Sequence, residues 1–267
     1  MKFRRLTALL VFASLGTGAA AQFYTYGDDP GKLKWYSISS PDFRIIYPEG
    51  LDSLALEYGK SLEKFRTPVG RSIGYEPDGL YRKPLPVILH AYSSANGMVT
   101  WAPRRMELLT GPDAEEPESL DWIDNLTVHE SRHASQMQFA HHRRYCIMNW
   151  LFGEMFTGAM SALYPGTALL EGDAVVTETA LTGKGRGRSA DFLEYYRVSF
   201  ADNDFRDFYQ WRWSSQDRYT PDHYRAGYML VGGVRAFFDD PLFATHYHDK
   251  FLYGIPHLPF NVLNKTS

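Results

Sequence analysis

The chain has 267 residues, 44% of them hydrophobic and 15% aromatic, which is enough to bury one sizeable core or two closely packed lobes. Its formal net charge is −3 and it has no long run of one sign, so nucleic-acid binding is not expected as its main role. Cys146 is the only cysteine, which excludes an intrachain disulfide.

Residues 1–21 have the organisation of a secretory signal peptide. Basic residues between Lys2 and Arg5 precede an apolar run over residues 6–15, and small residues follow up to Ala21. We expect cleavage after Ala21 and export to the periplasm, the cell envelope or the extracellular space.

The residues before the central motif predict a small sheet with a helix across it. Residues 35–47 are rich in β-formers and indicate one or two strands, and apolar side chains recur at helical spacing over residues 51–66. Ser93 to Gly97 have the composition of a turn. Further strands are expected over residues 84–92, 98–101 and 104–109.

Residues 129–133 have the pattern H-E-x-x-H. We place them on a helix that begins near Ser119 or Asp121, both good N-caps, and ends near His141. Residues four apart lie one above the other on a helix face, so both imidazoles can reach one ion, as zinc-binding histidines do. Glu130 lies about 100° around the helix, beside that ion, where it can take a proton from a water molecule.

A purely structural interpretation of the two histidines is also open. His129 and His133 belong to a stripe at helical spacing, so both could be hydrogen-bonded residues of the core. The other members of this stripe are Trp122, Leu126, Met137 and Ala140. Metal binding requires a third ligand from elsewhere in the chain, so the presence of such a residue would distinguish the two interpretations.

Residues 145–164 are the most apolar segment after the signal peptide. Their length is close to that of a membrane span, but Asn149, Glu154 and two glycines interrupt them. We expect a buried helix or a helix that lies on a hydrophobic surface, and peripheral contact with a membrane stays open.

A second helix is expected over residues 168–181, with Thr167 as its cap. Glu171 and Glu178 are seven residues apart and therefore lie on the same face of this helix. Glu171 follows two leucines, which makes it a candidate metal ligand, although two acids on a helix face can equally point to solvent. The remainder up to Asp239 has a mainly helical pattern.

H-E-x-x-H followed on a later helix by E-G-x-A-x-x-x-E resembles the gluzincin zinc metallopeptidases, and most closely their aminopeptidase-type branch. The resemblance implies an α+β fold of the thermolysin and aminopeptidase type, a Zn²⁺ cofactor and hydrolysis of peptides or proteins. It implies that His129, His133 and Glu171 bind the zinc. Glu130 is then the base that activates water, and Glu178 holds a ligand histidine in one tautomer.

Two further segments correspond to parts of these enzymes. Family members have a tyrosine in a Y-x-K-G segment, and Tyr224 to Gly227 correspond to it, although Ala226 stands in place of the lysine. The resemblance implies that the Tyr224 hydroxyl stabilises the oxyanion of the reaction, whereas a plain packing role is the alternative. Asn96 and Gly97 correspond to the edge strand on which these enzymes lay the substrate backbone.

The chain also departs from the family pattern. Between His133 and Glu171 lie 37 residues, about twice the interval usual in the aminopeptidase branch, and no G-A-M-E-N-like anchor for a substrate amino terminus occurs. The chain is also similar to exported bacterial gluzincin-like domains that precede a β-propeller. We expect it to be either a fragment that lacks its C-terminal propeller domain or a minimal version of such a protein.

These observations predict a signal peptide followed by one catalytic unit. The unit consists of a sheet lobe with the H-E-x-x-H helix over residues 22–142 and a helical lobe over residues 143–267. We expect an exported zinc metallopeptidase. Two alternatives are open: a gluzincin-fold module for binding or assembly at the cell envelope, and a zinc hydrolase that cleaves bonds other than peptides.

Overall fold

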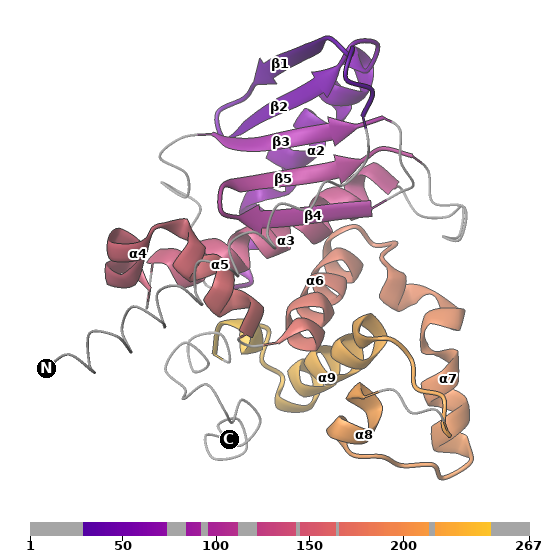
Figure 1. The fold of residues 1–267 in the computed structure, drawn as a ribbon. Coiled ribbons are helices and arrows are strands. Elements are labelled where there is room, and N and C mark those ends of the chain that lie inside the picture. The colour runs from indigo at the N-terminus through magenta and orange to yellow at the C-terminus, as the bar shows by residue number, and fades with distance from the viewer. Residues whose placement is uncertain are drawn as a thin grey trace, which may run out of the picture.

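The computed structural model describes residues 29–73, 84–91, 96–111, 122–142, 145–163, 166–213 and 217–246. The expected signal peptide and the expected helix caps Ser119 and Asp121 lie outside these ranges. The described part of the chain has an α+β fold, in which a sheet with two long helices on one face is followed by a group of helices (Figure 1).

The sheet is mixed and five-stranded, with the order β1-β2-β3-β5-β4. Its strands are β1 (Trp35–Ser39), β2 (Phe43–Pro48), β3 (Leu85–His90), β4 (Asn96–Trp101) and β5 (Arg104–Leu109). The central strands β2, β3 and β5 run parallel, whereas β1 and β4 are antiparallel to their neighbours. β4 is therefore an edge strand of the described sheet, and one of its sides has no strand partner there.

Two long helices, α2 (Asp52–Arg71) and α3 (Trp122–His142), cover one face of this sheet (Figure 1). Side chains alternate along a strand, so every second residue of β2, β3 and β5 points to this face. The main core contains Phe43, Ile45, Leu85, Val87, Leu89, Met106 and Leu108 from the sheet, Tyr58 and Leu62 from α2, and Leu126 and Ala134 from α3. The core thus holds the H-E-x-x-H helix firmly against the sheet.

The sequence places the end of the first helix too early. α2 continues beyond the expected end at Arg66, through Pro68, to Arg71. Val69 in this extension is fully buried against Val128 of α3. Burial of an apolar side chain against a distant helix offsets the loss of a backbone hydrogen bond at the proline.

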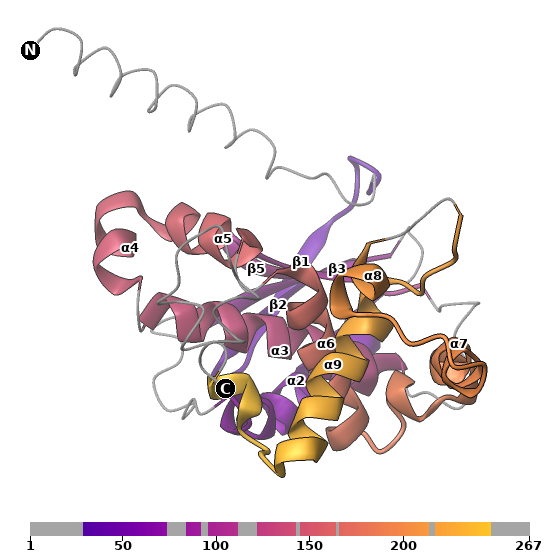
Figure 2. The same ribbon diagram turned by 90° about the horizontal axis from the view of Figure 1, so that it is seen from below.

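The second half of the fold is helical, as expected. It contains α6 (Thr167–Leu181), the short helix η2 (Arg186–Arg188), α7 (Ala190–Ala201), α8 (Phe208–Arg212) and α9 (His223–Phe238). α6 packs against both α3 and α9, and Figures 1 and 2 show it between them. Thr167 is the first residue of α6 and does not cap it; the N-cap is Gly166, whose φ of 95° lies in a region that glycine tolerates.

Two glycines bring the backbones of α6 and α9 into contact. A Cβ atom on Gly172 would lie 2.1 Å from the carbonyl carbon of Gly227, and one on Gly227 would lie 1.7 Å from the Ala168 oxygen. No side chain fits between the helices at this point. The contact fixes where Tyr224, one turn before Gly227, lies relative to Glu171.

The expectation of one continuous helix over residues 145–164 is wrong. The segment forms two helices, α4 (Cys146–Phe152) and α5 (Glu154–Leu163), that meet at Gly153, whose φ is 72°. A left-handed backbone at this position ends one helix and turns the chain into the next. None of the helices in the described ranges is long and apolar enough to cross a bilayer.

The expected turn at Asn96 and Gly97 is also wrong. Both residues belong to β4 and face Leu109 and Leu108 of β5 in the antiparallel register. The Asn-Gly sequence favours a turn locally, but here pairing with β5 extends the strand to Asn96. The preceding residues 92–95 lie outside the described part.

We predict that Gly227→Ala lowers the free energy of unfolding by about 1–3 kcal/mol or more, since the added methyl group would collide with the α6 backbone. Gly233→Ala is the matched control, because it lies on the same helix with no atom within 4 Å of the added Cβ. We expect the control to stabilise the protein by up to about 1 kcal/mol through helix propensity. Urea denaturation measures both, and equal effects would contradict the packing argument.

Candidate metal centre

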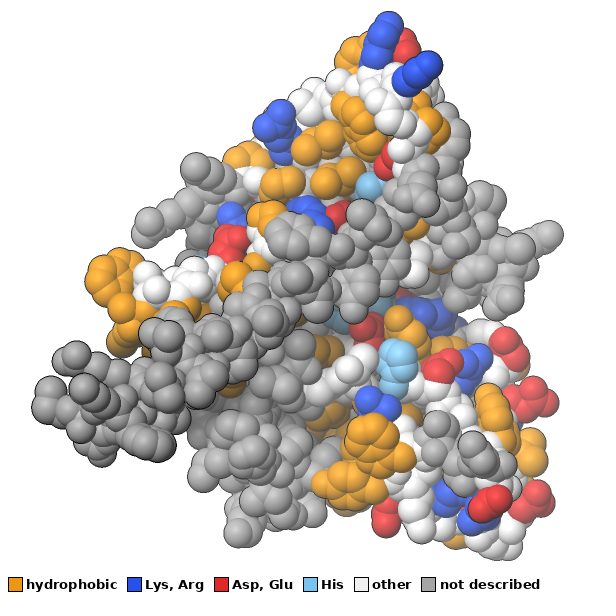
Figure 3. All heavy atoms as spheres, viewed as in Figure 1, with side chains coloured by type: hydrophobic (Ala, Val, Ile, Leu, Met, Phe, Trp, Pro, Cys, Tyr) orange, Lys and Arg blue, Asp and Glu red, His pale blue; other side chains and the backbone are white. Residues whose placement is uncertain are grey.

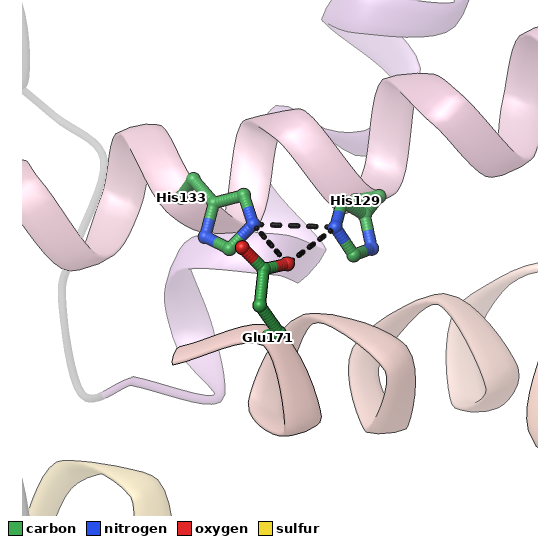
Figure 4. Close-up of side chains that lie close together, drawn as sticks. All are labelled: His129, His133 and Glu171. Atoms are coloured by element: carbon green, nitrogen blue, oxygen red, sulfur yellow. Dashed lines mark hydrogen bonds and ion pairs between the residues drawn. The ribbon is translucent and has the colours of Figure 1, made fainter. Parts of the chain in front are cut away.

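Three candidate metal ligands converge from two helices (Figure 4). His129 and His133 lie on α3, and Glu171 approaches them from α6. Oε2 of Glu171 is 3.1 Å from Nε2 of His129 and 3.0 Å from Nε2 of His133, and the two Nε2 atoms are 3.2 Å apart. The three atoms thus form a nearly equilateral triangle.

The triangle has almost the size of one face of a zinc coordination tetrahedron. Bonds of about 2.0–2.2 Å at tetrahedral angles place neighbouring ligand atoms roughly 3.3–3.6 Å apart. The observed separations are only slightly shorter. A small expansion would accommodate an ion and leave its fourth position to the cavity.

A buried carboxylate and an arginine lie behind His129. Nδ1 of His129 is 2.9 Å from Oε2 of Glu178, which can only accept, and 2.9 Å from Nη2 of Arg186, which can only donate. Because Nη2 of Arg186 also donates to Oε2 of Glu178, we assign the hydrogen on Nδ1 to the bond with the carboxylate. Burial would raise the pKa of Glu178, but Arg186 and His129 lower it to about 2. Arg186 donates from its side chain to both Glu178 oxygens, at 2.8 and 3.0 Å, and from its backbone N–H at 3.2 Å.

An amide determines the tautomer of His133. Nδ1 of His133 is 2.9 Å from Oε1 of Gln136. The Gln136 amide nitrogen donates to the Leu170 carbonyl at 3.1 Å and to Asp173 at 2.8 Å, so its oxygen must face the imidazole. The imidazole donates to that oxygen, and Nε2 presents a lone pair to the centre of the triangle.

The donor set therefore fits a cation. Two imidazole lone pairs and one carboxylate point at one another, and this arrangement needs a positive charge between them. Burial opposes a charge on His133, but the Glu171 carboxylate outweighs it and raises the pKa of His133 to about 10. Burial would also raise the pKa of Glu171, but the two histidines hold it far below its usual value. Either a proton or a metal ion can supply this charge, and neutral histidines with a carboxylate are typical zinc ligands.

A buried ion pair lies behind these ligands. Nε and Nη2 of Arg132 donate to the Asp173 carboxylate at 2.7 and 2.9 Å, and both side chains are fully buried. Nη1 of Arg132 donates to Val69 and Ser72 of the α2 end, at 2.7 and 2.8 Å. The pair thus connects α2, α3 and α6, and the same Asp173 orients Gln136 behind His133.

Glu130 lies beside the triangle and packs against the edge strand. It is 3% exposed, and burial raises the pKa of its carboxyl group. Its Oε2 atom has no hydrogen-bond partner among the described residues. A Cβ atom on Gly97 would lie only 2.6 Å from its Oε1. Gly97 is therefore needed for the carboxylate to occupy this position.

Tyr224 lies in the first turn of α9, across the cavity from α3. Its ring centroid is 6.1 Å from that of His129, and the Arg186 guanidinium carbon lies 5.0 Å from the centre of its ring. Burial raises the pKa of the Tyr224 hydroxyl, so this group stays protonated and can donate at neutral pH. The arrangement offers a phenol donor close to the ligand histidines.

One cavity of about 280 Å³ joins these parts. Strand β4 lines one side of it, α3 and α6 line the others, and η2 and α9 contribute one residue each. The cavity brings together every site residue that the sequence proposes: Asn96, Gly97, His129, Glu130, His133, Glu171, Glu178 and Tyr224.

Three polar residues of the site were missed in the sequence. Gln136 follows His133 by three positions on the same helix face, a signal that could have identified it. Asp173 lies inside the E-G-x-A segment, but nothing local indicates that it pairs with Arg132. Arg186 comes from a glycine-rich loop, and only the tertiary structure places it on Glu178.

Comparisons with known protein families, with curated proteins and with solved structures found no match to this chain. The interpretation of the site therefore depends on its own geometry and on the sequence motifs.

We predict that Asp173→Asn destabilises the fold by about 3–5 kcal/mol, because it leaves the buried Arg132 charge without its counter-charge. Arg218→Ala is the control, since Arg218 is 59% exposed and pairs with Asp204 at the surface. Loss of such a pair costs about 1 kcal/mol or less. Urea denaturation in excess chelator separates this effect from metal binding, and similar losses in both variants would refute the prediction.

Proposed function

We propose that the protein is an exported zinc metallopeptidase with a gluzincin-type catalytic domain. The single observation on which this proposal depends is the convergence of His129, His133 and Glu171, from two different helices, onto one point. Three ligand atoms lie at coordination spacing, and both imidazoles are held by hydrogen bonds from behind, which is more than a hydrogen-bonded core needs.

Zinc held by these residues would polarise a scissile carbonyl and lower the pKa of water toward neutrality. Glu130 would take the proton from the attacking water and pass it to the leaving amine. Its raised pKa and its open Oε2 atom suit a group that must both accept and release a proton. Tyr224 would donate its hydroxyl hydrogen to the oxyanion as charge develops there.

The edge strand supports a peptide as the substrate. β4 has one side without a strand partner in the described sheet, and its residues 96–99 line the cavity. An extended peptide could add to this edge through backbone hydrogen bonds and thereby bring a peptide bond beside Glu130. Gly97 allows the close approach of the strand to the base. Export is proposed from residues 1–21 alone.

We predict that the purified chain binds about one zinc ion, measured by elemental analysis after dialysis. His133→Ala should weaken zinc binding by more than the roughly 10- to 100-fold typical of losing a group behind a ligand. His246→Ala is the control, because its side chain is 61% exposed and lies outside the cavity. Equal zinc content in all three proteins would exclude the proposed ligand set.

We further predict that Glu130→Gln keeps the zinc and lowers the rate of peptide hydrolysis by about 100- to 10,000-fold, because the proton acceptor is lost. Glu57→Gln makes the same chemical change on the exposed side of α2 and should leave the rate unchanged. A peptide-library digest followed by mass spectrometry gives the readout.

The same digest separates the alternatives. Stoichiometric zinc without cleavage by the unaltered chain would favour a binding or assembly module. Cleavage of esters or non-peptide amides alone would indicate a zinc hydrolase of another class. Full peptidase activity in Glu130→Gln would remove this residue from the mechanism.

A further inference from the structure

Helices α4 and α5 present an apolar surface that no described part of the chain covers. Trp150 is 83% exposed and Ile147 68%, and both lie on α4. The rest of the face consists of Leu151, Phe152 and Met155, each at least 42% exposed. In Figure 3 hydrophobic side chains gather at the left edge of the molecule, where Figure 1 places α4. We call these five residues the α4–α5 face.

The polar groups of these two helices point inward instead of outward. Asn149 is buried, donates to the His141 carbonyl at 3.3 Å and accepts from the buried Thr157 hydroxyl at 2.5 Å. Glu154 accepts the backbone N–H of Arg104 at 3.0 Å. A helix hairpin with its polar groups inside and its largest apolar groups outside is arranged for an apolar surrounding.

The charges around the face also favour one kind of partner. Glu154 is the only charged residue between positions 145 and 163, and its carboxylate is used within the protein. The chain before α4 reads His141-His142-Arg143-Arg144, and only Tyr145 separates this run from the helix. An apolar face with tryptophan, next to a short basic run and free of outward acids, has the composition of an anchor at an anionic lipid surface.

The shape of this region agrees with a bilayer better than with a protein groove. Figures 1 and 2 both show α4 at the periphery, projecting away from the sheet and from α6 and α9. α4 has seven residues, too few to span a bilayer, and α5 has ten. Short helices that project with a tryptophan at their most exposed point can enter the headgroup region without crossing the membrane.

We propose that the α4–α5 face seats the protein on an anionic membrane surface. Trp150 and its apolar neighbours enter the boundary between headgroups and acyl chains, and the two arginines that the sequence has shortly before α4 add the positive charge that an anionic surface attracts. α3 ends at His142, and the nine residues of helix after His133 correspond to roughly 14 Å. α4 begins four residues later, at Cys146. The cavity would therefore work close to the bilayer surface. The membrane proposal does not depend on zinc or on catalysis.

The test is flotation of the full chain with vesicles made of equal amounts of phosphatidylcholine and phosphatidylglycerol. The variant Trp150→Ser/Leu151→Ser/Phe152→Ser should reduce the partition coefficient at least about tenfold, since three exposed apolar side chains lose their contact with lipid. Arg143→Gln/Arg144→Gln should reduce binding to the anionic vesicles about tenfold or more, with little effect on pure phosphatidylcholine.

The matched control is Phe205→Ser/Trp213→Ser/Phe237→Ser. These residues are 70%, 64% and 82% exposed and lie in the region of α7 to α9, so the control removes three exposed apolar side chains of comparable or larger size elsewhere. The control should bind vesicles within about twofold of the unaltered chain. Circular dichroism and thermal melts check that all variants fold.

Three results would overturn the proposal. The first is vesicle binding that the α4 variant does not weaken, which would assign binding to another part of the chain, such as the apolar N-terminal run. The second is an equal loss in the α7–α9 control. The third is absence of vesicle binding together with a dimer, seen by light scattering, that the α4 variant converts to a monomer, because a second copy would then cover the face.

Discussion

The contact between α3 and α6 is the constraint on which the rest of this structure depends. It is built around the fully buried Arg132–Asp173 pair, whose bidentate geometry fixes how the two helices face each other. Two buried charges in contact cost much desolvation, and the hydrogen bonds from Arg132 to the end of α2 help to offset it. As a result, Glu171 meets His129 and His133 at coordination distance.

The polar side chains around the two histidines form a connected hydrogen-bond network. Each imidazole in the triangle has a partner behind it, Glu178 in one case and Gln136 in the other, and each partner is itself hydrogen-bonded. Such a network is stable only when every member is satisfied, so it leaves few alternative arrangements for the ligand atoms. In α4 and α5 the polar side chains are also hydrogen-bonded within the protein. Asn149 accepts from Thr157, and the Glu154 carboxylate accepts from the Arg104 backbone, so apolar side chains form the exposed face.

Glycine has a specific role at two close approaches. Gly97 lets the edge strand come within contact of the Glu130 carboxylate, and Gly172 with Gly227 lets α9 come close enough to place Tyr224 at the cavity. In both cases a single Cβ atom would separate elements that supply different parts of the site. These glycines carry no functional group themselves, but their small size allows Glu130 and Tyr224 to occupy their places at the cavity.

The sequence alone determined the local geometry. The spacing of His129 and His133 stacks them on any helix, the spacing of Glu171 and Glu178 puts both on one face, and the strand and helix periodicities predict most elements of the α+β fold. Tertiary structure alone decided that Asn96 and Gly97 belong to a strand, that residues 145–163 form two helices, and that Arg186 reaches Glu178. The physical reason is that intrahelical spacing follows from backbone geometry, whereas contacts between elements depend on which surfaces the whole chain buries together.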